Sequence, residues 1–188
     1  REIPYDQLVL AIGSVSNDFG TPGVAENCYF LDSLPQAERF HRALLNQLIR
    51  INQQEDKDAK INVAIVGAGA TGTELAAQLH HVANLSRAYG MPDMSASRLK
   101  ITIVEAGERI LPALPERIAN SARKALYNLG VDIREQTMVS QADANGLITK
   151  DGTSIDADLM VWAAGVKAPD FITKMEIFET NRANQILV

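Results

Sequence analysis

One short run of sequence constrains the fold more than any other, because a stretch typical of a buried β-strand leads directly into a glycine-rich turn. The strand is Ile61–Val66, the glycines have the spacing Gly-x-Gly-x-x-Gly, and an apolar helical pattern follows at once. Between a strand and a helix, Gly67 allows the tight turn, Gly69 lets a pyrophosphate approach the backbone, and Gly72 lets the helix pack closely. The free N–H groups of the helix N-terminus then face the phosphates. The run therefore predicts a dinucleotide site, against the plainer alternative of a glycine turn that only packs.

Composition limits the kinds of function that the chain can have. Its 188 residues are enough for one ordinary domain, and 46% hydrophobic with 22% charged residues is typical of a folded protein. The net charge of −5, without a dense run of Lys or Arg, argues against nucleic-acid binding. The single cysteine, Cys28, excludes a disulfide framework and favours a reducing, intracellular setting. No signal peptide or membrane-spanning stretch is recognisable, and because the chain starts at Arg1 we expect a piece of a longer protein.

The order of the expected elements predicts the fold class. A first helix should follow the capping candidates Asp32 and Ser33 and place apolar residues on one face as far as Ile51. Strands are expected at residues 5–12, 61–66, 100–105, 131–134 and 159–163, further helices at about 70–85 and 116–129, and short antiparallel pieces at 137–140, 146–149 and 153–155. The dipeptides Asn145-Gly146 and Asp151-Gly152 are hairpin-turn signals. The sequence therefore predicts an α/β fold, a Rossmann-like central parallel sheet with flanking helices and a small antiparallel β-meander.

Glu105 is the acidic residue that a dinucleotide site requires. It ends the strand expected over residues 100–105, where an acidic side chain binds the hydroxyl groups of the adenosine ribose. The interval from Gly72 exceeds the usual ~20 residues, and a loop inserted around residues 89–97 accounts for the excess. A carboxylate here repels a 2′-phosphate, so NADH is favoured over NADPH; Arg109 is near, but Glu108 offsets its charge. The plainer alternative is a surface glutamate at a strand end.

Two further features stay open on the residues alone. Glu74 lies in the first turn of the expected helix, where the helix dipole stabilises a carboxylate by about 0.3–1 kcal/mol, and it either serves that purpose or faces a nicotinamide. The run Ala163-Ala164-Gly165 ends a strand at the carboxyl edge, where ligands of open parallel sheets bind. It contacts a cofactor only if that strand lies beside the glycine-motif strand. The three histidines lack the spacing of metal ligands, so no metal site is expected.

Several runs of sequence together resemble the type II NADH dehydrogenases, which are non-proton-pumping NADH:quinone oxidoreductases. They are residues 5–14 (YDQLVLAIGS), 66–76 (VGAGATGTELA), 103–112 (IVEAGERILP) and 161–169 (VWAAGVKAP), and the run 179–185 (ETNRANQ) also fits. The first two runs are shared by many flavoproteins with two dinucleotide domains. The run from Trp162 to Pro169 is more particular to this family.

The resemblance implies two nested dinucleotide domains, an outer one for FAD and an inner one for NADH. Residues 1–24 would be a stub of the split FAD-binding domain, residues 25–178 the NADH-binding domain, and residues 179–188 the return toward the FAD-binding domain. The sequence lacks the glycine motif of the FAD domain and the segments that bind the membrane and quinone. We therefore expect exposed apolar surface around residues 8–12 and 179–188, and no turnover by this piece alone.

The resemblance also implies an activity, in which hydride passes from NADH to FAD and electrons then reduce a membrane quinone. The full-length protein would be a peripheral respiratory enzyme on the cytoplasmic side of the inner membrane, with a homodimer as a further expectation, whereas this piece would be soluble. No side chain would act as a general acid or base, and Glu74 is the candidate for positioning the nicotinamide. The expected cofactor contacts are Gly67, Ala68, Gly69, Ala70, Thr71, Gly72, Glu74, Glu105, Ala106, Arg109, Ala164, Gly165 and Val166 toward NADH, and Gly13 toward FAD.

Two alternatives remain beside this hypothesis. One is the NADH-binding domain of another flavoprotein, such as a ferredoxin reductase or a disulfide reductase whose cysteines lie in the FAD domain. The other belongs to a different class, a nucleotide-sensing module without catalysis. An upstream glycine motif in the full-length protein would dismiss the second.

Overall fold

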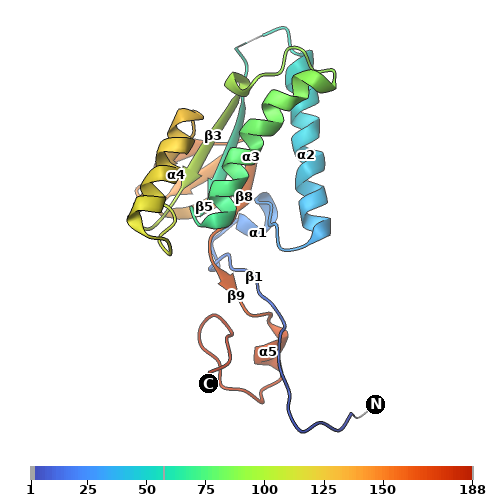
Figure 1. Cartoon of the computed structure of the whole chain (residues 1–188), viewed down its shortest axis with the longest axis vertical. Helices are drawn as coiled ribbons and strands as arrows, with labels where there is room; N and C mark the ends of the chain where they lie inside the picture. Colours follow the sequence, from blue (N-terminus) through green and yellow to red (C-terminus); the bar gives the residue numbers. More distant parts are fainter. Residues whose placement is uncertain (1–2, 57, 188) are drawn as a thin grey trace.

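Four parallel strands form the centre of the structure, a computed structural model that describes residues 3–56 and 58–187. The strands are β2 (Ile61–Val66), β3 (Leu99–Val104), β4 (Asp132–Arg134) and β8 (Leu159–Trp162). They lie in the order β4-β3-β2-β8, and each neighbouring pair is parallel. All four strands therefore end at the same carboxyl edge, which faces the two chain termini (Figure 1).

The strand order reverses at β2. From β2 the chain passes through α3 (Ala70–Ser86) to β3 and through α4 (Glu116–Asn128) to β4, all on one side of β2. β8 then pairs with the other side of β2. Ligands of open parallel sheets bind outside the strand ends at such a switch point. The topology thus brings the turn after β2 and the turn after β8 next to each other.

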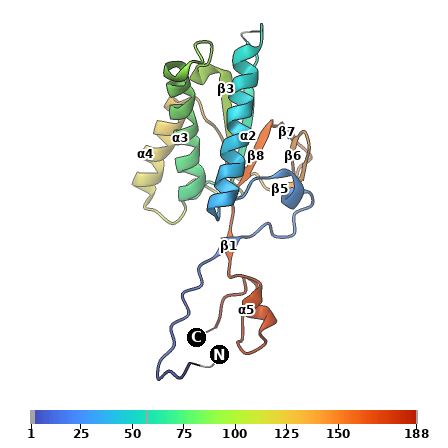
Figure 2. The same ribbon diagram turned by 90° about the vertical axis from the view of Figure 1, so that its right-hand side faces the viewer.

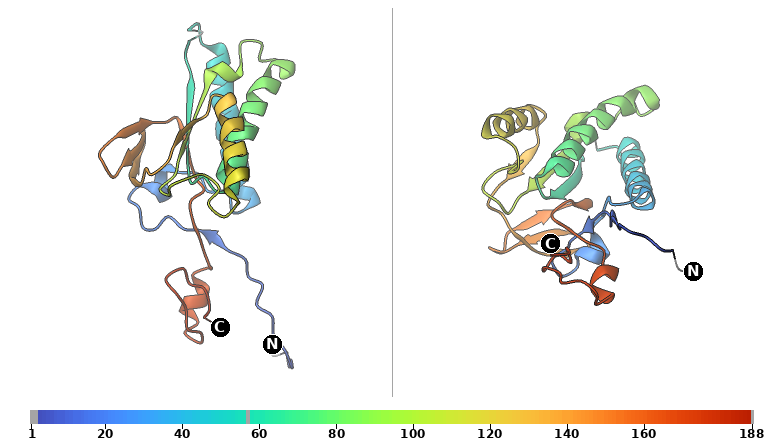
Figure 3. Two further views of the ribbon diagram at one scale, coloured as in Figure 1. Left: turned by 60° about the vertical axis from the view of Figure 1, so that its left-hand side comes forward. Right: turned by 60° about the horizontal axis from the view of Figure 1, so that its bottom comes forward.

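Two different layers cover the two faces of the sheet. The helices α2 (Leu34–Gln53), α3 and α4 lie along one face, whereas the antiparallel strands β5 (Val139–Asp143), β6 (Gly146–Thr149) and β7 (Ser154–Asp156) lie on the other (Figures 2 and 3). The hairpin turns at residues 145–146 and 151–152 join these three strands, as predicted. The predicted fold class, a parallel sheet with flanking helices and a small antiparallel meander, is confirmed.

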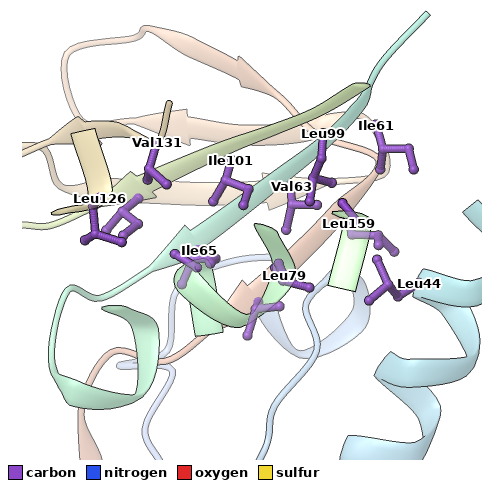
Figure 4. Close-up of a cluster of buried hydrophobic side chains, with 14 of the residues drawn as sticks. Leu44, Ile61, Val63, Ile65, Leu79, Leu99, Ile101, Leu126, Val131 and Leu159 are labelled. Carbon is purple, nitrogen blue, oxygen red and sulfur yellow. The ribbon is translucent and has the colours of Figure 1, made fainter. Parts of the chain in front are cut away.

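The central strands are apolar on both faces because both faces are covered. In β2, Val63 and Ile65 point toward the helices, and Ala64 and Val66 point toward the meander. Figure 4 shows the helix-side cluster, in which side chains of β2, β3 and β8 meet Leu44 of α2 and other residues of the helices. Strands buried on both sides lack the polar alternation of a half-exposed sheet, so they give continuous apolar runs. This is why the sequence located them well.

The first helices show one prediction confirmed and one element missed. α2 begins at Leu34, and the Gln36 side-chain oxygen accepts the backbone N–H groups of Asp32 at 2.8 Å and Ser33 at 3.1 Å, which fixes the start of the helix. The sequence did not indicate α1 (Val24–Asn27), which has only four residues. Between them Tyr29 forms a parallel bridge to Val161, so the short segment between α1 and α2 extends the sheet beyond β8.

A narrow ribbon joins the sheet domain to both chain ends. β1 (Val15–Ser16) pairs antiparallel with β9 (Val166–Lys167), and the Asp32 carboxylate accepts both the backbone N–H (2.9 Å) and the hydroxyl (2.7 Å) of Ser16. Beyond the ribbon, the N-terminal segment and the C-terminal segment with α5 (Phe171–Lys174) extend away from the sheet (Figure 1). No helix in the described ranges is both long enough and apolar enough to span a bilayer.

The prediction of a buried strand at residues 5–12 is wrong. The segment forms no strand, and its apolar side chains are exposed, including Val9 at 86%. A β-strand requires a neighbour that shares its backbone hydrogen bonds, and no described segment pairs with it. The accompanying prediction of exposed apolar surface is confirmed around residues 8–12, where Leu8, Leu10 and Ile12 are also exposed, and at Leu187 in the C-terminal segment.

The inserted loop is present and lies at the amino edge of the sheet. It contains two 3₁₀ turns, Arg87–Tyr89 and Ala96–Arg98. Arg98 is almost fully buried, and its guanidinium donates to the carbonyls of Asp56 (2.8 Å), Ala59 (3.1 Å) and Asp93 (3.3 Å). The insertion therefore lengthens the connection between α3 and β3, and Glu105 still directly follows the carboxyl end of β3.

Candidate dinucleotide-binding site

A cavity of about 630 Å³ opens at the carboxyl edge of the sheet, at the switch point of the topology. The ends of β2, β3 and β8 form its floor, and residues before α1 and at the start of β5 form further walls. Its lining residues are Phe19, Thr21, Val66, Gly67, Gly69, Val104, Glu105, Ala106, Pro112, Thr137, Met138, Val139, Trp162, Ala163, Ala164 and Gly165. A mostly apolar cleft with a few polar groups is the usual form of a cofactor site.

Two glycines of the motif are required by the packing around them. Gly67 has a φ of +100°, and a Cβ atom there would lie 2.7 Å from the backbone nitrogen of Ala164. A Cβ atom at Gly72 would lie 2.0 Å from the carbonyl oxygen of Gly67. Gly67 thus allows the loop to touch the end of β8, and Gly72 allows α3 to pack against the loop.

Gly69 is different, because apart from its own chain neighbours no described atom of the protein lies within 4 Å of the position that its Cβ atom would take. It lines the cavity and is the N-cap of α3, with extended backbone that any residue can adopt. Packing therefore does not require a glycine here. The open space lies in front of the first N–H groups of α3, which have no partner within the helix and suit an anion.

Glu105 is held in place by backbone hydrogen bonds to both of its side-chain oxygens. One oxygen accepts the N–H of Ala68 at 2.7 Å and the other accepts the N–H of Gly107 at 2.7 Å. An ionised carboxylate has about four acceptor positions, so two remain for a ligand. The carboxylate lines the cavity beside the glycine loop, in a position to accept hydrogen bonds from sugar hydroxyl groups.

The end of β8 lies beside the glycine loop, which was the condition for the Ala163-Ala164-Gly165 run to contact a ligand. The N–H of Ala163 donates to the carbonyl of Val66 at 2.8 Å, and all three residues of the run line the cavity. Trp162, which precedes the run, is buried and donates its indole N–H to the carbonyl of Asn17 at 2.9 Å. The segment before α1 is thereby attached to this end of the sheet.

Most of the other predicted residues lie around the cavity rather than in its lining. Ala68 is the buried residue of the loop, and Ala70 and Thr71 are exposed in the first turn of α3. Glu74 is also exposed, but it is the fifth residue of α3 and so lies just beyond the first turn in which the sequence placed it. Val166 belongs to β9 and Gly13 precedes β1, and both are exposed. Ala106 does line the cavity, next to Glu105. The structure thus brings Gly67, Gly69, Glu105, Ala106, Ala164 and Gly165 together in the lining.

Arg109 has a structural contact that the sequence did not indicate. Its guanidinium donates to the carbonyls of Leu111 (3.1 Å), Pro112 (2.9 Å) and Leu114 (2.9 Å). These bonds hold the loop that places Pro112 in the cavity wall. Arg109 therefore shapes the site, and its guanidinium is already engaged by backbone carbonyls.

The charges in the cavity are few. Among the described residues that line it, Glu105 is the only one with a charged side chain. Cys28 lies in the core, where burial raises the pKa of its thiol to about 12, so it is a poor nucleophile. Within the part of the chain that the structure describes, no group of His, Cys, Asp and Glu could hold a metal ion, and the expected absence of a metal site stays a prediction.

Sequence reasoning missed the walls of the cavity opposite the strand ends. Phe19 and Thr21 precede α1, and residues 137–139 begin the meander, so both segments are far in sequence from the glycine motif. Only the tertiary fold brings them to the site. The one signal was the Gly- and Pro-rich character of residues 20–23, which indicated a loop but gave no location.

Several proteins with known names are similar to this chain in sequence. The family model of the pyridine nucleotide-disulphide oxidoreductases matches residues 1–188. The type II NADH:quinone oxidoreductase of Haemophilus influenzae is 47% identical over 202 residues, which cover 100% of this chain and 46% of that protein. The mitochondrial external alternative NADH-ubiquinone oxidoreductase of Yarrowia lipolytica is 31% identical over 176 residues, which cover 88% of this chain and 30% of that protein. The chain thus spans less than half the length of these curated relatives.

Solved structures share the fold. NDH2 from Plasmodium falciparum in complex with NADH aligns with a TM-score of 0.76 and 23% identity, over 86% of this chain and 35% of that chain. A ferredoxin reductase from Rhodopseudomonas palustris aligns with a TM-score of 0.73 and 21% identity, over 99% of this chain and 40% of that chain. At such identities the likeness concerns the fold alone. Because the family model matches the sequence from end to end, the chain belongs to the pyridine nucleotide-disulphide oxidoreductase family.

Proposed function

We propose that the chain is the NADH-binding domain of a flavin-dependent, type II NADH:quinone oxidoreductase. The observation behind the proposal is that the glycine loop, the Glu105 carboxylate and the turn after β8 all line one cavity. The 47% identity to the type II enzyme of Haemophilus influenzae favours this member of the family over a ferredoxin or disulfide reductase.

The order of the strands gives the bound dinucleotide a direction. Glu105 follows β3, the glycine loop follows β2 and Gly165 follows β8, and adjacent strands lie about 4.8 Å apart. With the adenosine ribose on Glu105 and the pyrophosphate on Gly67–Gly72, the nicotinamide end extends toward Ala164 and Gly165. Glu74, at the solvent-exposed start of α3, remains the candidate that approaches the nicotinamide from the helix side.

The residues of this chain would bind and orient NADH rather than react with it. NADH supplies a hydride when bound, and the flavin of the full-length protein would accept it. The α3 N-terminus would hold the pyrophosphate, Glu105 would hold the ribose, and the apolar walls would exclude water from the nicotinamide. Since hydride transfer needs no proton at the nicotinamide, no cavity side chain has to act as an acid or base.

The other parts of the proposal concern the full-length protein. They are FAD as hydride acceptor with Gly13 near it, a membrane quinone as electron acceptor, peripheral attachment to the cytoplasmic side of the inner membrane, and a homodimer. The domain limits near residues 24 and 178 are part of the same proposal. Full-length protein supplied with FAD and NADH would distinguish the candidates: it should reduce a quinone, whereas a ferredoxin reductase would prefer ferredoxin and a sensor would reduce neither.

A calorimetric titration of this chain with NADH and NADPH tests the binding site itself. We expect tighter binding of NADH, because Glu105 would repel a 2′-phosphate. Glu105→Gln should weaken NADH binding about tenfold, since it removes a charged acceptor. It should also reduce the preference for NADH over NADPH. Glu108→Gln is the matched control, because this exposed glutamate loses the same charge outside the cavity lining. Equal affinities for both nucleotides, or no effect of Glu105→Gln, would contradict the ribose role.

A further inference from the structure

Phe19 has a backbone conformation that a bulky residue rarely adopts. Its φ is +53°, in the left-handed region that is strained for residues with a Cβ atom. Its side chain is not part of the described core: it is 65% exposed, and it lines the cavity at the carboxyl edge. Strained backbone of this kind persists where the surroundings enforce it, and it clusters at ligand sites. Core packing therefore does not account for the position of this ring.

Hydrogen bonds fix the turn that presents the ring. The side-chain oxygen of Asn17 accepts the N–H of Phe19 at 3.0 Å, and the side-chain oxygen of Asp18 accepts the N–H of Gly20 at 3.0 Å. The same turn is attached to the end of β8, because the Asn17 carbonyl accepts the Trp162 indole N–H at 2.9 Å. The backbone N–H of Asn17 also donates to the carbonyl of Gly165 at 3.3 Å. The ring is thus held relative to the strand end that forms the cavity floor.

The ring lies directly on the backbone of Gly165. A Cβ atom at that glycine would lie 2.3 Å from the Cζ atom of Phe19 and 2.7 Å from its Cε2 atom. Any side chain at residue 165 would therefore displace the ring. One face of the cavity at its β8 end consists of an aromatic ring packed on bare backbone, at the end opposite Glu105.

We infer that Phe19 is a contact residue for the nicotinamide end of the dinucleotide, and that its ring forms the apolar wall against which the nicotinamide lies. The inference rests on the proposed function, which directs the nicotinamide toward Gly165. Aromatic rings prefer offset-stacked or edge-to-face contacts, and both are compatible with a ring held on one side only. The ring packs on Gly165 after β8, whereas Glu105 follows β3 on the other side of β2, so we expect its contribution to be specific to the nicotinamide half.

The test compares two ligands that differ by the nicotinamide. NADH and ADP-ribose share the adenosine and pyrophosphate groups, but ADP-ribose lacks the nicotinamide ring. Calorimetric titration of Phe19→Ala and Phe19→Leu should show roughly tenfold weaker NADH binding and unchanged ADP-ribose binding. Phe19→Tyr should retain the affinity for NADH, because it keeps the ring. Tyr127→Ala is the control, since this tyrosine of α4 is 77% exposed and lies outside the cavity lining.

Each outcome decides the question. Unchanged NADH affinity in Phe19→Leu, or an equal loss for NADH and ADP-ribose, would overturn the inference, because the ring would then be dispensable or would shape the whole cleft. If Phe19→Ala does not fold in a thermal melt, Phe19→Leu decides, since it keeps most of the apolar volume. In these cases only the inference about Phe19 fails, because the unmodified chain would still bind ADP-ribose as the proposed function requires. Failure of the unmodified chain to bind either ligand would overturn the proposed function itself.

Discussion

At the scale of single residues, Glu105 connects the glycine loop after β2 with the turn after β3. Its carboxylate holds the backbone of the glycine loop at Ala68 and the turn at Gly107, so the acceptor is oriented before any ligand arrives. Binding groups that are oriented in advance lose little conformational entropy when a ligand binds. Replacing Glu105 therefore changes the hydrogen bonds of the loop as well as the charge, and Glu105→Gln is the mildest replacement because it keeps the size of the side chain and one acceptor oxygen.

A second glutamate, Glu135, has a structural role that depends on pH. Its oxygens accept two hydrogen bonds from Arg123 and one from the N–H of Ile110, at 2.7 Å. The hydrogen bond from Arg123 lowers the pKa of Glu135, and burial opposes this effect. A carboxyl group whose pKa is lower in the folded state stabilises the fold above its unfolded pKa of about 4.3, and this stabilisation is lost as the pH falls through the folded pKa.

We therefore expect Glu135→Gln to lower the free energy of unfolding at pH 7 by about 1–2 kcal/mol. The effect is modest because Arg123 is 38% exposed and solvent screens the pair. Urea unfolding at several pH values checks this, and the difference between the two proteins should shrink below about pH 4. Glu38→Gln, on the exposed surface of α2, serves as control. A difference that stays constant down to pH 3 would rule out this ion pair as its source.

At the scale of elements, the inserted loop and the binding site lie at opposite edges of the sheet. The loop follows the C-terminal end of α3, whereas the site surrounds its N-terminal end. Arg98 holds this loop by donating to three carbonyls from two separate segments. The loop can therefore lose its order without any change in the shape of the cavity.

Arg98→Met tests this separation. Removing the buried guanidinium leaves three carbonyls without their donor, and we expect a loss of roughly 2–4 kcal/mol in the free energy of unfolding. Amide hydrogen exchange should speed up across residues 87–98, while the NADH affinity stays the same. Arg87→Met, an exposed change in the same loop, should alter neither quantity. A weaker NADH affinity in Arg98→Met would mean that the two edges are coupled.

The sequence predicts the elements of the sheet domain well because both faces of the sheet are buried. β2 has the predicted bounds, and the bounds of the other central strands differ from the prediction by one residue at most. Strong apolar runs between polar loops leave few alternatives for such strands. Residues 5–12 have an equally apolar pattern and form no strand, because a strand also needs a partner, which a pattern within one segment cannot supply.

Contacts that depend on loop geometry could not be predicted in this way. Phe19, Arg98 and Arg109 are defined by backbone carbonyls or glycines that lie elsewhere in the chain or across a turn. No spacing rule relates Phe19 to Gly165, because the two residues meet only after the whole sheet has formed. Glu105 could be predicted because the end of a particular strand is a position that the fold repeats from protein to protein.

At the scale of the whole molecule, the sheet domain stands apart from the terminal segments. Residues 3–12 are exposed and make no strand pairing within the described chain, whereas Ser16, Asn17 and Phe19 are attached to the domain. Exposed apolar segments of this kind mark surfaces that bind another domain or protein. The part of the chain that folds on its own should therefore begin near β1, so it includes the end of the segment 1–24 that is proposed above as the stub of the FAD-binding domain.

Two truncations test this boundary. Deleting residues 1–12 should leave the melting temperature and the NADH affinity unchanged, and it should reduce the fluorescence of a dye that binds exposed apolar surface. Deleting residues 1–20 should lower the melting temperature by several degrees, because it also removes the Ser16 and Asn17 hydrogen bonds. Equal melting temperatures for the two truncated proteins would show that the segment around β1 contributes nothing to the fold.

The β1–β9 ribbon also has a consequence for the order in which the chain folds. Its two strands are only two residues long, yet their pairing closes a loop that contains every strand of the central sheet. Closing so long a loop costs much entropy for very few hydrogen bonds, unless the intervening chain is already compact. We therefore expect the central sheet and its helices to assemble first, and the two strands of the ribbon to pair last. The Phe19 wall of the cavity closely follows β1 in the chain and is attached to Trp162 and Gly165, so we expect it to become ordered at the same late stage.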